Sequence, residues 1–213
     1  MFIVFEGVDG SGKSTQLQRC HTWLDESGQD VVVCRDPGST GLGDRLRQVL
    51  LDKSDLNIDP VSETFLFMAA RAQLVREVIL PARQENRIVL CDRFLMSTVV
   101  YQGYAGSLDP QTVRQIGETA TAGLQPDLTL VFDTSVDVAM GRMGQHLDRM
   151  ESRGEEFMET VRRGFLSESA ASPCSTVIDA SGDPADIQQL VRRAVQSCLD
   201  HRSTEQPQPD SRA

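Results

Sequence analysis

Residues 7–14 read GVDGSGKS, a glycine, four further residues, a second glycine, a lysine and a serine, and they follow directly on the apolar run 1–5. Glycines at this spacing let backbone N–H groups close around phosphate oxygens, while a lysine ammonium lies between the β- and γ-phosphates and the next helix adds its positive dipole end. The chain has only two lysines, Lys13 and Lys53, so composition does not account for Lys13 in this position. The segment predicts a phosphate-binding loop in which Ser14 holds Mg²⁺. The residues expected to contact the nucleotide are Gly7, Val8, Asp9, Gly10, Ser11, Gly12, Lys13, Ser14 and Thr15.

The loop alone leaves the reaction open. The same glycines could form a ligand-free turn between a strand and a helix, although their position directly after an apolar run favours nucleotide binding. Kinases, GTPase switches and motor ATPases share such a loop. A switch or motor needs a hydrolytic water, whereas a small-molecule kinase needs a second phosphate site, so the arginines of the chain help to discriminate.

Three arginines are candidates for that second site. Arg93 stands at the end of an apolar strand, and Arg47 lies in a helix that follows a glycine-containing turn. Arg71 lies one helical turn after Phe67, so the pair shares one face and could present a ring for stacking beside a guanidinium. Taken singly, each arginine could instead be a solvated surface charge, and Phe67 could be a core residue.

The composition narrows the class of protein. The chain has 213 residues, 39% hydrophobic content and a net charge of −10, which fits one sizeable core and argues against a nucleic-acid polymer or an anionic membrane surface as partner. Five cysteines form no CxxC pair, which suits reduced thiols and argues against structural zinc. The apolar N-terminal run is too short for a secretory or membrane-spanning segment. We therefore expect a cytoplasmic protein.

Apolar runs alternate with helical patterns along the chain. Strands are predicted at 2–6, 30–35, 87–91, 127–132 and 175–179. Helices are predicted at 13–27, 42–52, 61–85, 94–103, 110–122, 135–145, 154–170 and 184–200, with a kink at Pro81. No hairpin turn joins consecutive strands, so the pattern indicates an α/β fold with a five-stranded parallel sheet covered by helices on both faces. We expect a single domain over 1–200 and a disordered tail over 201–213.

Charged and glycine-rich segments follow the first three predicted strands. They are the phosphate loop, the segment 35–40 (RDPGST) and the segment 92–94 (DRF). In an open parallel sheet, ligands bind beyond the carboxyl ends of the strands. The three segments are therefore expected to meet at one rim.

The chain resembles the thymidylate kinases, nucleoside monophosphate kinases that transfer the γ-phosphoryl group of ATP to dTMP. The resemblance runs from Met1 to about Leu199 and rests on FEGVDGSGKST, RDPGST, LFMAARAQL, CDRF, STVVYQGYAG, QPDLTLVFD and LDRMES. The third to fifth of these motifs, in this order, separate the family from adenylate, guanylate and cytidylate kinases. The resemblance implies a P-loop kinase fold, ATP and Mg²⁺ as cofactors, dTMP as substrate and a homodimer.

The resemblance also implies contacts to the nucleoside of dTMP. Asp9 should accept the 3′-hydroxyl of the deoxyribose. Phe67 should stack on thymine, and Arg71 should hydrogen-bond its exocyclic oxygen. Thr98 and Gln102 should lie near the other polar edge of the base.

A second group is implied for the sugar, the phosphates and the metal. Tyr101 should crowd the ribose 2′ position and so favour a deoxynucleotide. Arg47 and Arg93 should grip the 5′-phosphate, and Asp92 should orient Mg²⁺ or its waters, although an ion pair with Arg93 is an alternative role. The remaining predicted substrate-binding residues are Asp36 and Ser97.

The stretch 147–153 (LDRMESR) matches the lid of the family, a loop that closes over ATP. In relatives whose phosphate loop lacks an arginine, as here, the lid supplies the catalytic one. The resemblance therefore implies a short helical lid over about 142–157, with Arg149 as the first candidate and Arg153 as the second, beside Lys13 and Arg93 as catalytic residues. Both lid arginines could instead be solvated charges.

Three positions depart from the family pattern. Asp36 replaces a glutamate, Ser39 replaces a glycine, and Phe94 stands where tyrosine or histidine is common. We expect the shorter Asp36 carboxylate to hold its partners less directly and Phe94 to lose one polar contact.

Three other kinds of protein are alternatives to a thymidylate kinase. A kinase of another mononucleotide or deoxynucleoside is the nearest. A GTP-dependent switch lacks its NKxD signature here. An ATP-dependent nucleic-acid-handling module conflicts with the acidic composition.

Overall fold

Five parallel strands form one sheet in the computed structural model, which describes residues 1–52, 56–143 and 154–205, with side chains as far as His201. Their order across the sheet is β2-β3-β1-β4-β5. The strands are β1 (Phe2–Gly7), β2 (Val31–Arg35), β3 (Ile88–Asp92), β4 (Leu128–Asp133) and β5 (Ser175–Asp179). The predicted five-stranded parallel sheet is confirmed, and the register pairs Arg35 with Asp92 and Phe5 with Asp92, so β1, β2 and β3 end near one another.

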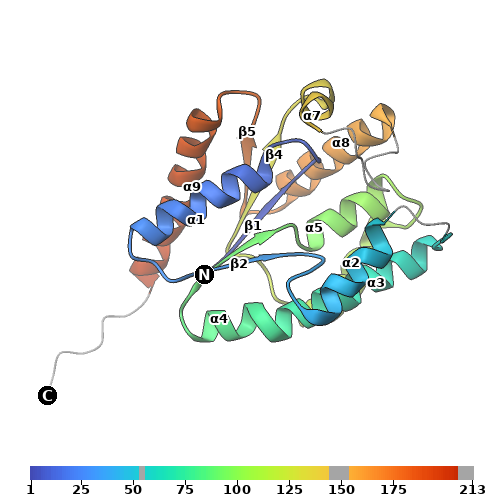
Figure 1. The fold of residues 1–213 in the computed structure, drawn as a ribbon, viewed down its shortest axis with the longest axis horizontal. Helices are drawn as coiled ribbons and strands as arrows, with labels where there is room; N and C mark the ends of the chain where they lie inside the picture. Colours follow the sequence, from blue (N-terminus) through green and yellow to red (C-terminus); the bar gives the residue numbers. More distant parts are fainter. Residues whose placement is uncertain (53–55, 144–153, 206–213) are drawn as a thin grey trace, which may run out of the picture.

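Helices lie on both faces of this sheet (Figure 1). They are α1 (Lys13–Glu26), α2 (Gly41–Leu51), α3 (Pro60–Leu74), α4 (Leu80–Gln84), α5 (Leu95–Thr98), α6 (Pro110–Thr121), α7 (Val136–Arg142), α8 (Glu155–Ala171) and α9 (Pro184–Glu205), with two π-helical segments, η1 (Val75–Ile79) and η2 (Val99–Tyr104). None of the described helices is long and apolar enough to cross a membrane.

The central strand β1 is buried along its whole length, because helices cover both of its faces. Its side chains alternate between two cores. Ile3 and Phe5 pack in one core with residues of α1 and α9. Phe2 and Val4 pack in the other with residues of α3, η1 and α4. Packing in the two cores holds β1 in place, and the phosphate loop follows β1 at the rim of the sheet.

Capping residues fix where the helices beside that rim begin. Asp59 accepts hydrogen bonds from the N–H groups of Val61 and Ser62, and Pro60 occupies the first turn of α3. Thr40 caps α2 by accepting from Gly43 N–H. These caps fix the first residues of α2 and α3, two helices that contribute side chains to the rim.

The predicted helix 61–85 is continuous but not uniform. The segment η1 precedes Pro81, which lies in the first turn of α4. Proline lacks the N–H of the normal helical ladder and crowds the preceding turn, and a wider π turn relieves both effects. The predicted helix 94–103 likewise divides into α5 and η2. The last helix, α9, continues to Glu205, past the predicted end at 200 and into the predicted tail, while 206–213 lie outside the described residues.

Candidate active site

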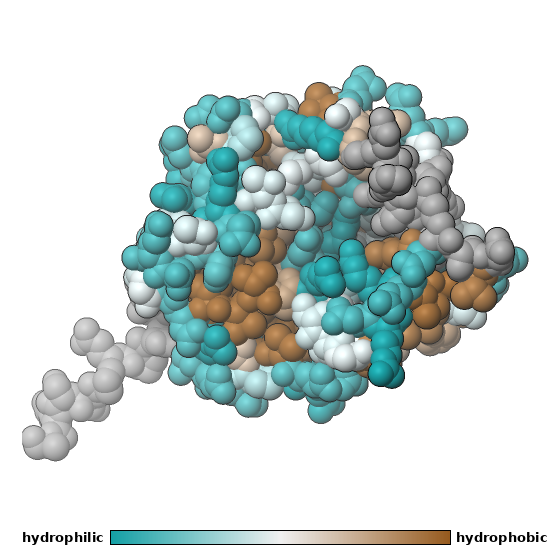
Figure 2. Space-filling model, in the orientation of Figure 1, coloured by the Kyte–Doolittle hydropathy of each residue, from teal (hydrophilic) through white to brown (hydrophobic). Residues whose placement is uncertain are grey.

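A cleft with a volume of about 720 Å³ opens at the carboxyl ends of the strands. Hydrophilic residues line most of the recess on the face drawn in Figure 2. The phosphate loop, the segment after β2, the segment after β3, and helices α2, α3, α5 and η2 all contribute side chains. The three predicted rim segments therefore meet in one cleft, as expected for an open parallel sheet.

The N-terminus of α1 faces this cleft through Lys13, Ser14 and Thr15. No side chain caps the helix at Gly12, and the first turn of α1 contains no acidic residue. The first backbone N–H groups and the positive dipole end are therefore left for an anionic ligand. Ser11 adds a buried hydroxyl that has no hydrogen-bond partner among the described residues.

Lys13 is folded back onto the loop. Its ammonium donates to Val8 O at 2.7 Å and lies 3.8 Å from an Asp9 carboxylate oxygen. Burial, reinforced by the positive charge of Arg93, lowers the pKa of Lys13 to about 8. The pKa is depressed because the ammonium is poorly solvated, and a polyanion in the cleft would restore its usual charge.

Gly10 and Gly12 both have left-handed backbones, with φ of 78° and 90°. A Cβ on Gly10 would lie 2.1 Å from Ala139 O, whereas a Cβ on Gly12 would meet nothing within 4 Å. The first glycine therefore permits α7 to pack directly on the loop. Gly12 is needed only for its left-handed backbone conformation.

Gly10→Ala should accordingly destabilise the fold far more than Gly12→Ala. We expect a loss of about 3 kcal/mol or more for Gly10→Ala, because steric overlap adds to backbone strain. Gly12→Ala should cost roughly 1–2 kcal/mol from strain alone. Urea unfolding of both variants measures the difference, and equal losses would show that α7 does not constrain the loop.

Arg93 forms the centre of the cleft opposite the loop. Its Nη1 donates to Gly7 O at 3.1 Å and to Ser97 Oγ at 2.9 Å, and its Nη2 pairs with Asp9. The backbone at Arg93 is left-handed, with φ of 69°. A non-glycine residue in this region is strained and needs support from its surroundings, as is common at functional sites.

The charges around Arg93 are strongly coupled. Burial opposes ionisation of Asp9, but the positive charges of Arg93 and Lys13 outweigh it and hold the pKa of the Asp9 carboxyl well below its usual range. Burial likewise disfavours the charged guanidinium, yet Asp9 and neighbouring groups hold the pKa of Arg93 well above its usual value. The Asp9–Arg93 pair is therefore charged at any physiological pH.

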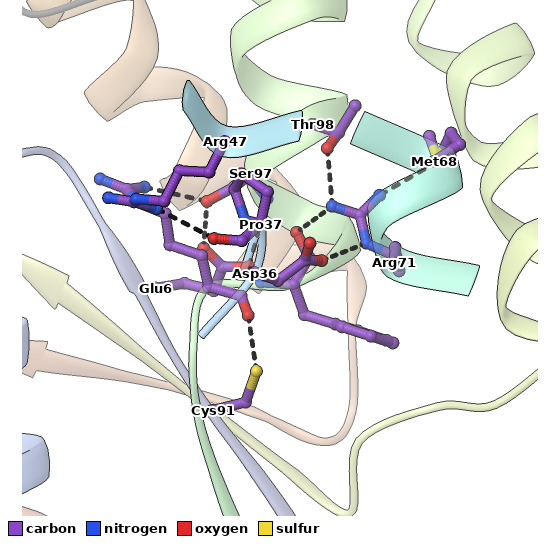
Figure 3. A network of polar contacts seen from close by, with 11 residues as sticks. Glu6, Asp36, Pro37, Arg47, Met68, Arg71, Cys91, Ser97 and Thr98 are labelled. Atoms are coloured by element: carbon purple, nitrogen blue, oxygen red, sulfur yellow. Dashed lines mark hydrogen bonds and ion pairs between the residues drawn. The ribbon is translucent and has the colours of Figure 1, made fainter. Parts of the chain in front are cut away.

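A buried carboxylate supports this pair from behind. Glu6 accepts from Phe94 N–H at 2.9 Å. It also accepts from the Ser97 hydroxyl at 2.5 Å (Figure 3). The same hydroxyl accepts from Arg93. Burial raises the pKa of Glu6, although the charge of Arg93 and these hydrogen bonds oppose the rise. Glu6 thus holds the start of α5 and, through Ser97, the Arg93 guanidinium.

Ser14 and Asp92 lie together beside the loop. The Ser14 hydroxyl donates to Asp92 Oδ2 at 3.1 Å. The other oxygen, Oδ1, is buried and has no hydrogen-bond partner among the described residues. No group of three or more His, Cys, Asp or Glu gathers in the described parts of the chain. A hydroxyl with one carboxylate fits Mg²⁺, which usually completes its shell with waters and substrate phosphates.

Asp36 and Arg71 form a fully buried pair at the other end of the cleft (Figure 3). Arg71 Nε donates to Asp36 Oδ2 at 2.5 Å, and Nη2 donates to Phe94 O and, at 2.8 Å, to Thr98 Oγ. The expectation that the short Asp36 carboxylate would hold its partners less directly is therefore wrong. The carboxylate reaches the guanidinium in one direct bond, so a further methylene is not needed for this contact.

The other two departures from the family pattern also have structural consequences. Ser39 has a φ of 62°, a left-handed value that explains why glycine is usual there. The Phe94 ring packs edge-on against Phe2 at 5.0 Å and lies 5.5 Å from the Arg71 guanidinium carbon. A tyrosine hydroxyl is not needed for this contact.

The remaining predicted acceptor residues also line the cleft. Arg47 donates to Pro37 O at 3.1 Å, from α2. Tyr101 donates to Asp9 Oδ2 at 2.8 Å. Phe67 lies on α3 in the same core cluster as Tyr101. Gln102 Nε2 donates to Glu63 Oε1 at 2.8 Å. Aromatic, amide and cationic side chains from α2, α3 and η2 thus line the same cleft.

Comparisons with known proteins agree with this geometry. The family model of thymidylate kinases matches residues 5–191. The thymidylate kinase of Symbiobacterium thermophilum is 42% identical over 204 residues, covering 95% of both chains. The chain belongs to the thymidylate kinase family. The family resemblance predicted from the sequence is therefore confirmed.

Other members of the family support the same assignment. The thymidylate kinase of Nitratidesulfovibrio vulgaris is 44% identical over 209 residues, covering 93% of this chain and 97% of its own. The crystal structure of thymidylate kinase from Ehrlichia chaffeensis has a TM-score of 0.75 and 31% identity, and covers 92% of this chain and 98% of its own.

Most of the predicted site residues of this family member meet in the cleft, but not all. Gly7 ends β1 and Val8 is buried beneath the loop, and neither lines the cleft. Arg149 and Arg153 lie outside the described residues. Seven cleft residues were not predicted: Gln16, Arg35, Pro37, Leu51, Arg142, Pro184 and Ile187.

Three of these unpredicted residues, Arg142, Pro184 and Ile187, come from separate elements. Arg142 ends α7 and donates to Ala180 O at 3.0 Å, and Pro184 and Ile187 begin α9. No spacing in the sequence links these residues. The only sequence signal is their position after the fourth and fifth predicted strands, at the rim where ligands bind.

Proposed function

We propose that this protein transfers the γ-phosphoryl group of ATP to dTMP and forms dTDP. The single observation that carries the proposal is that two sets of anion-binding groups face each other in one cleft, the phosphate loop on one side and the arginines Arg47 and Arg93 on the other. The names and sequence identities of the relatives support dTMP as the acceptor.

The phosphate loop binds the triphosphate of ATP. The N-terminus of α1, the Ser11 hydroxyl and Lys13 supply the donors for its oxygens. Arg142, Pro184 and Ile187 line the same cleft as the loop and offer a surface for the adenine ring. Arg142 contributes a planar guanidinium that can stack on a base.

Ser14 and Asp92 hold Mg²⁺ with the phosphates of ATP. The unpartnered Oδ1 of Asp92 is the observation that supports this role. When bound, the metal ion neutralises charge on the phosphate oxygens. Asp92 also keeps the Ser14 hydroxyl turned toward the site.

Arg93 and Arg47 bind the 5′-phosphate of dTMP and offset its repulsion from ATP. The acceptor phosphate is already anionic near neutral pH, so no general base is needed and catalysis depends on positioning and charge stabilisation. Asp9, within the loop, faces the acceptor, and its carboxylate accepts a hydrogen bond from the 3′-hydroxyl. Ser97 and Glu6 keep Arg93 in place for the transfer.

Phe67 stacks on the thymine ring while Arg71 donates to its exocyclic oxygen. Asp36 and Thr98 fix the guanidinium of Arg71, so its direction is set before the base arrives. Gln102 faces the remaining polar edge of the ring.

A lid over about 142–157 closes on the bound nucleotides. Arg149, with Arg153 as the second candidate, then stabilises the charge that spreads over the transferring group. Closure excludes water, so that the γ-phosphoryl group passes to dTMP and not to solvent. The lid belongs to a single kinase domain over residues 1–200.

Tyr101→Ala should relax discrimination against ribonucleotides. The Tyr101 ring lies 5.3 Å from the Arg93 guanidinium carbon, and its hydroxyl bonds to Asp9, so the ring is held beside the proposed sugar site. Removing it opens space for a 2′-hydroxyl. The ratio of kcat/KM for dUMP to that for UMP should fall about tenfold, since a small steric change in a pocket is worth roughly 1–3 kcal/mol. An unchanged ratio would remove Tyr101 from this role.

The proposed reaction is tested with a panel of acceptors. Purified protein with ATP and Mg²⁺ should form ADP and dTDP from dTMP, detected by chromatography of both products. Turnover of dCMP, dGMP and AMP should be far slower. Hydrolysis of ATP without any phosphorylated acceptor would refute the proposal.

The active protein is a cytoplasmic homodimer in this proposal. Exposed apolar side chains on α2 and α3 support an assembly of two copies, namely Leu42, Val49, Val61 and Phe65. Five free cysteines support a reducing compartment. Light scattering of the purified chain measures its mass, and a monomer at micromolar concentration would contradict the dimer.

A further inference from the structure

Three residues at intervals of four form a stripe on one face of α3, and two of them, Phe67 and Arg71, line the cleft. The stripe consists of Glu63, Phe67 and Arg71, and all three are buried. Residues four apart lie on one face of a helix. Thr98 and Gln102, also four apart, lie opposite on α5 and η2. Two hydrogen bonds join the stripes, from Arg71 to Thr98 and from Gln102 to Glu63, each 2.8 Å long. Phe67 lies between the two bonds along α3.

Glu63 fixes the orientation of the Gln102 amide. An ionised carboxylate accepts hydrogen bonds and donates none, so the amide must turn its NH₂ group toward α3. Glu63 and Gln102 are only 7% and 4% exposed, so water does not compete with the bond. The amide oxygen of Gln102 must therefore point away from Glu63. Gln102 belongs to the cleft wall. Its amide oxygen accepts no hydrogen bond from a described residue, and it is not one of the buried side-chain atoms that lack a partner.

The ring site beside Phe67 thus has a donor on one side and an acceptor on the other. Arg71 has five N–H groups, of which four donate to Asp36, Met68, Phe94 and Thr98, and the fifth is on Nη1. Thymine and uracil carry a carbonyl next to an N3–H, which matches a donor beside an acceptor. Cytosine carries an amino group next to an unprotonated N3, which reverses both.

We propose that Glu63 is a specificity-determining positioning residue, which selects pyrimidines with an N3–H by locking the Gln102 amide with its oxygen toward the base. The inference rests on the proposed function, because it places the base of the acceptor against Phe67. In this role Glu63 touches no substrate and acts on the base through its hydrogen bond with Gln102.

A purely structural role makes a different prediction. Glu63 lies in the first turn of α3, where a negative charge stabilises the helix dipole. Loss of that stabilisation would lower activity with every acceptor equally. Selection through Gln102 changes the ratio between acceptors that differ only at N3 and C4. The pair dUMP and dCMP differs in this way.

The decisive variant is Glu63→Gln, which keeps the shape and removes the fixed acceptor. The new amide can donate or accept, so Gln102 is free to turn over. The ratio of kcat/KM for dUMP to that for dCMP should fall about tenfold or more, since one unsatisfied buried polar group costs roughly 1–3 kcal/mol. An unchanged ratio, or an equal loss with both acceptors, would overturn the proposal.

Two further variants complete the test. Glu77→Gln is the matched control, because Glu77 accepts from Gln73 in an exposed pair outside the cleft, and its ratio should equal that of wild type. The double variant Glu63→Gln with Gln102→Glu rebuilds an amide–carboxylate bond and keeps an acceptor-only group toward the base. For the double variant, the ratio of kcat/KM for dUMP to that for dCMP should return toward the wild-type ratio. This test remains available if the single variant Glu63→Gln does not fold. A double variant that accepts dCMP as well as dUMP would contradict the proposal.

Calorimetric binding of dUMP and dCMP separates this inference from the proposed function. Wild-type protein without turnover of dTMP would refute the function. The affinity ratio of dUMP to dCMP, compared between wild type and Glu63→Gln, would still decide the role of Glu63. A ratio that falls about tenfold supports it, as one discriminating hydrogen bond predicts, and an unchanged ratio refutes it.

Discussion

Arg93→Ala should lower kcat/KM for dTMP by at least about a hundredfold, because it removes a charge-stabilising donor from the proposed acceptor site. The loss should appear in both kcat and KM. Arg93 holds the 5′-phosphate in the ground state and offsets the approach of two polyanions during transfer. The substitution also leaves Asp9 with one cationic neighbour fewer, since Arg93 and Lys13 are the two charges that lower its pKa. An unbalanced carboxylate next to the γ-phosphate would repel it.

Steady-state kinetics of Arg93→Ala against wild type measure this loss. Arg114→Ala is the matched control, because Arg114 pairs with Glu168 away from the cleft and its loss should change kcat/KM little. Arg93→Lys keeps a positive charge but loses the fork that binds Gly7, Ser97 and Asp9 together, so it should recover only part of the activity. Near wild-type kinetics of Arg93→Ala would remove Arg93 from the acceptor site.

Lys13→Ala should lower kcat by at least about a hundredfold at saturating ATP and dTMP. The Lys13 side chain is buried within the loop. It bonds to Val8 O and lies near Asp9, so its position is held by contacts within the loop. A phosphate oxygen replaces the backbone carbonyl as its partner, and the charge then acts where negative charge develops during transfer.

Rapid-quench measurement of a single turnover isolates the effect of Lys13→Ala on the chemical step. Lys13→Arg tests the shape of the charge, because a planar guanidinium does not fit between two phosphates as a compact ammonium does. Thermal unfolding of each variant shows whether the fold is intact. Wild-type single-turnover rates in a folded Lys13→Ala protein would contradict the assigned role.

The sequence predicted the parts of the site that depend on local pattern. The phosphate loop, the parallel sheet and the rim segments follow from fixed spacing and from apolar runs, which short stretches of chain determine. The placement of Arg71 beside Phe67 follows from helical periodicity. These features do not depend on how distant elements meet.

Features that arise from contacts between distant elements were not predicted. The wall made by Arg142, Pro184 and Ile187 needs the end of α7 to lie beside the start of α9, which no local pattern shows. The Asp36–Arg71 bond joins the segment after β2 to α3, which no local pattern places together, so the effect of the shorter carboxylate was misjudged. The π-helical segments η1 and η2 likewise depend on packing as well as on propensity.

The central claim is that one cleft holds both phosphate sites at once. A bisubstrate compound, with adenosine and thymidine joined through five phosphates, tests it most directly. The compound should inhibit competitively against ATP and also against dTMP, and it should bind one molecule per chain more tightly than either substrate. Competition with only one of the two substrates, or binding of two molecules per chain, would contradict the account.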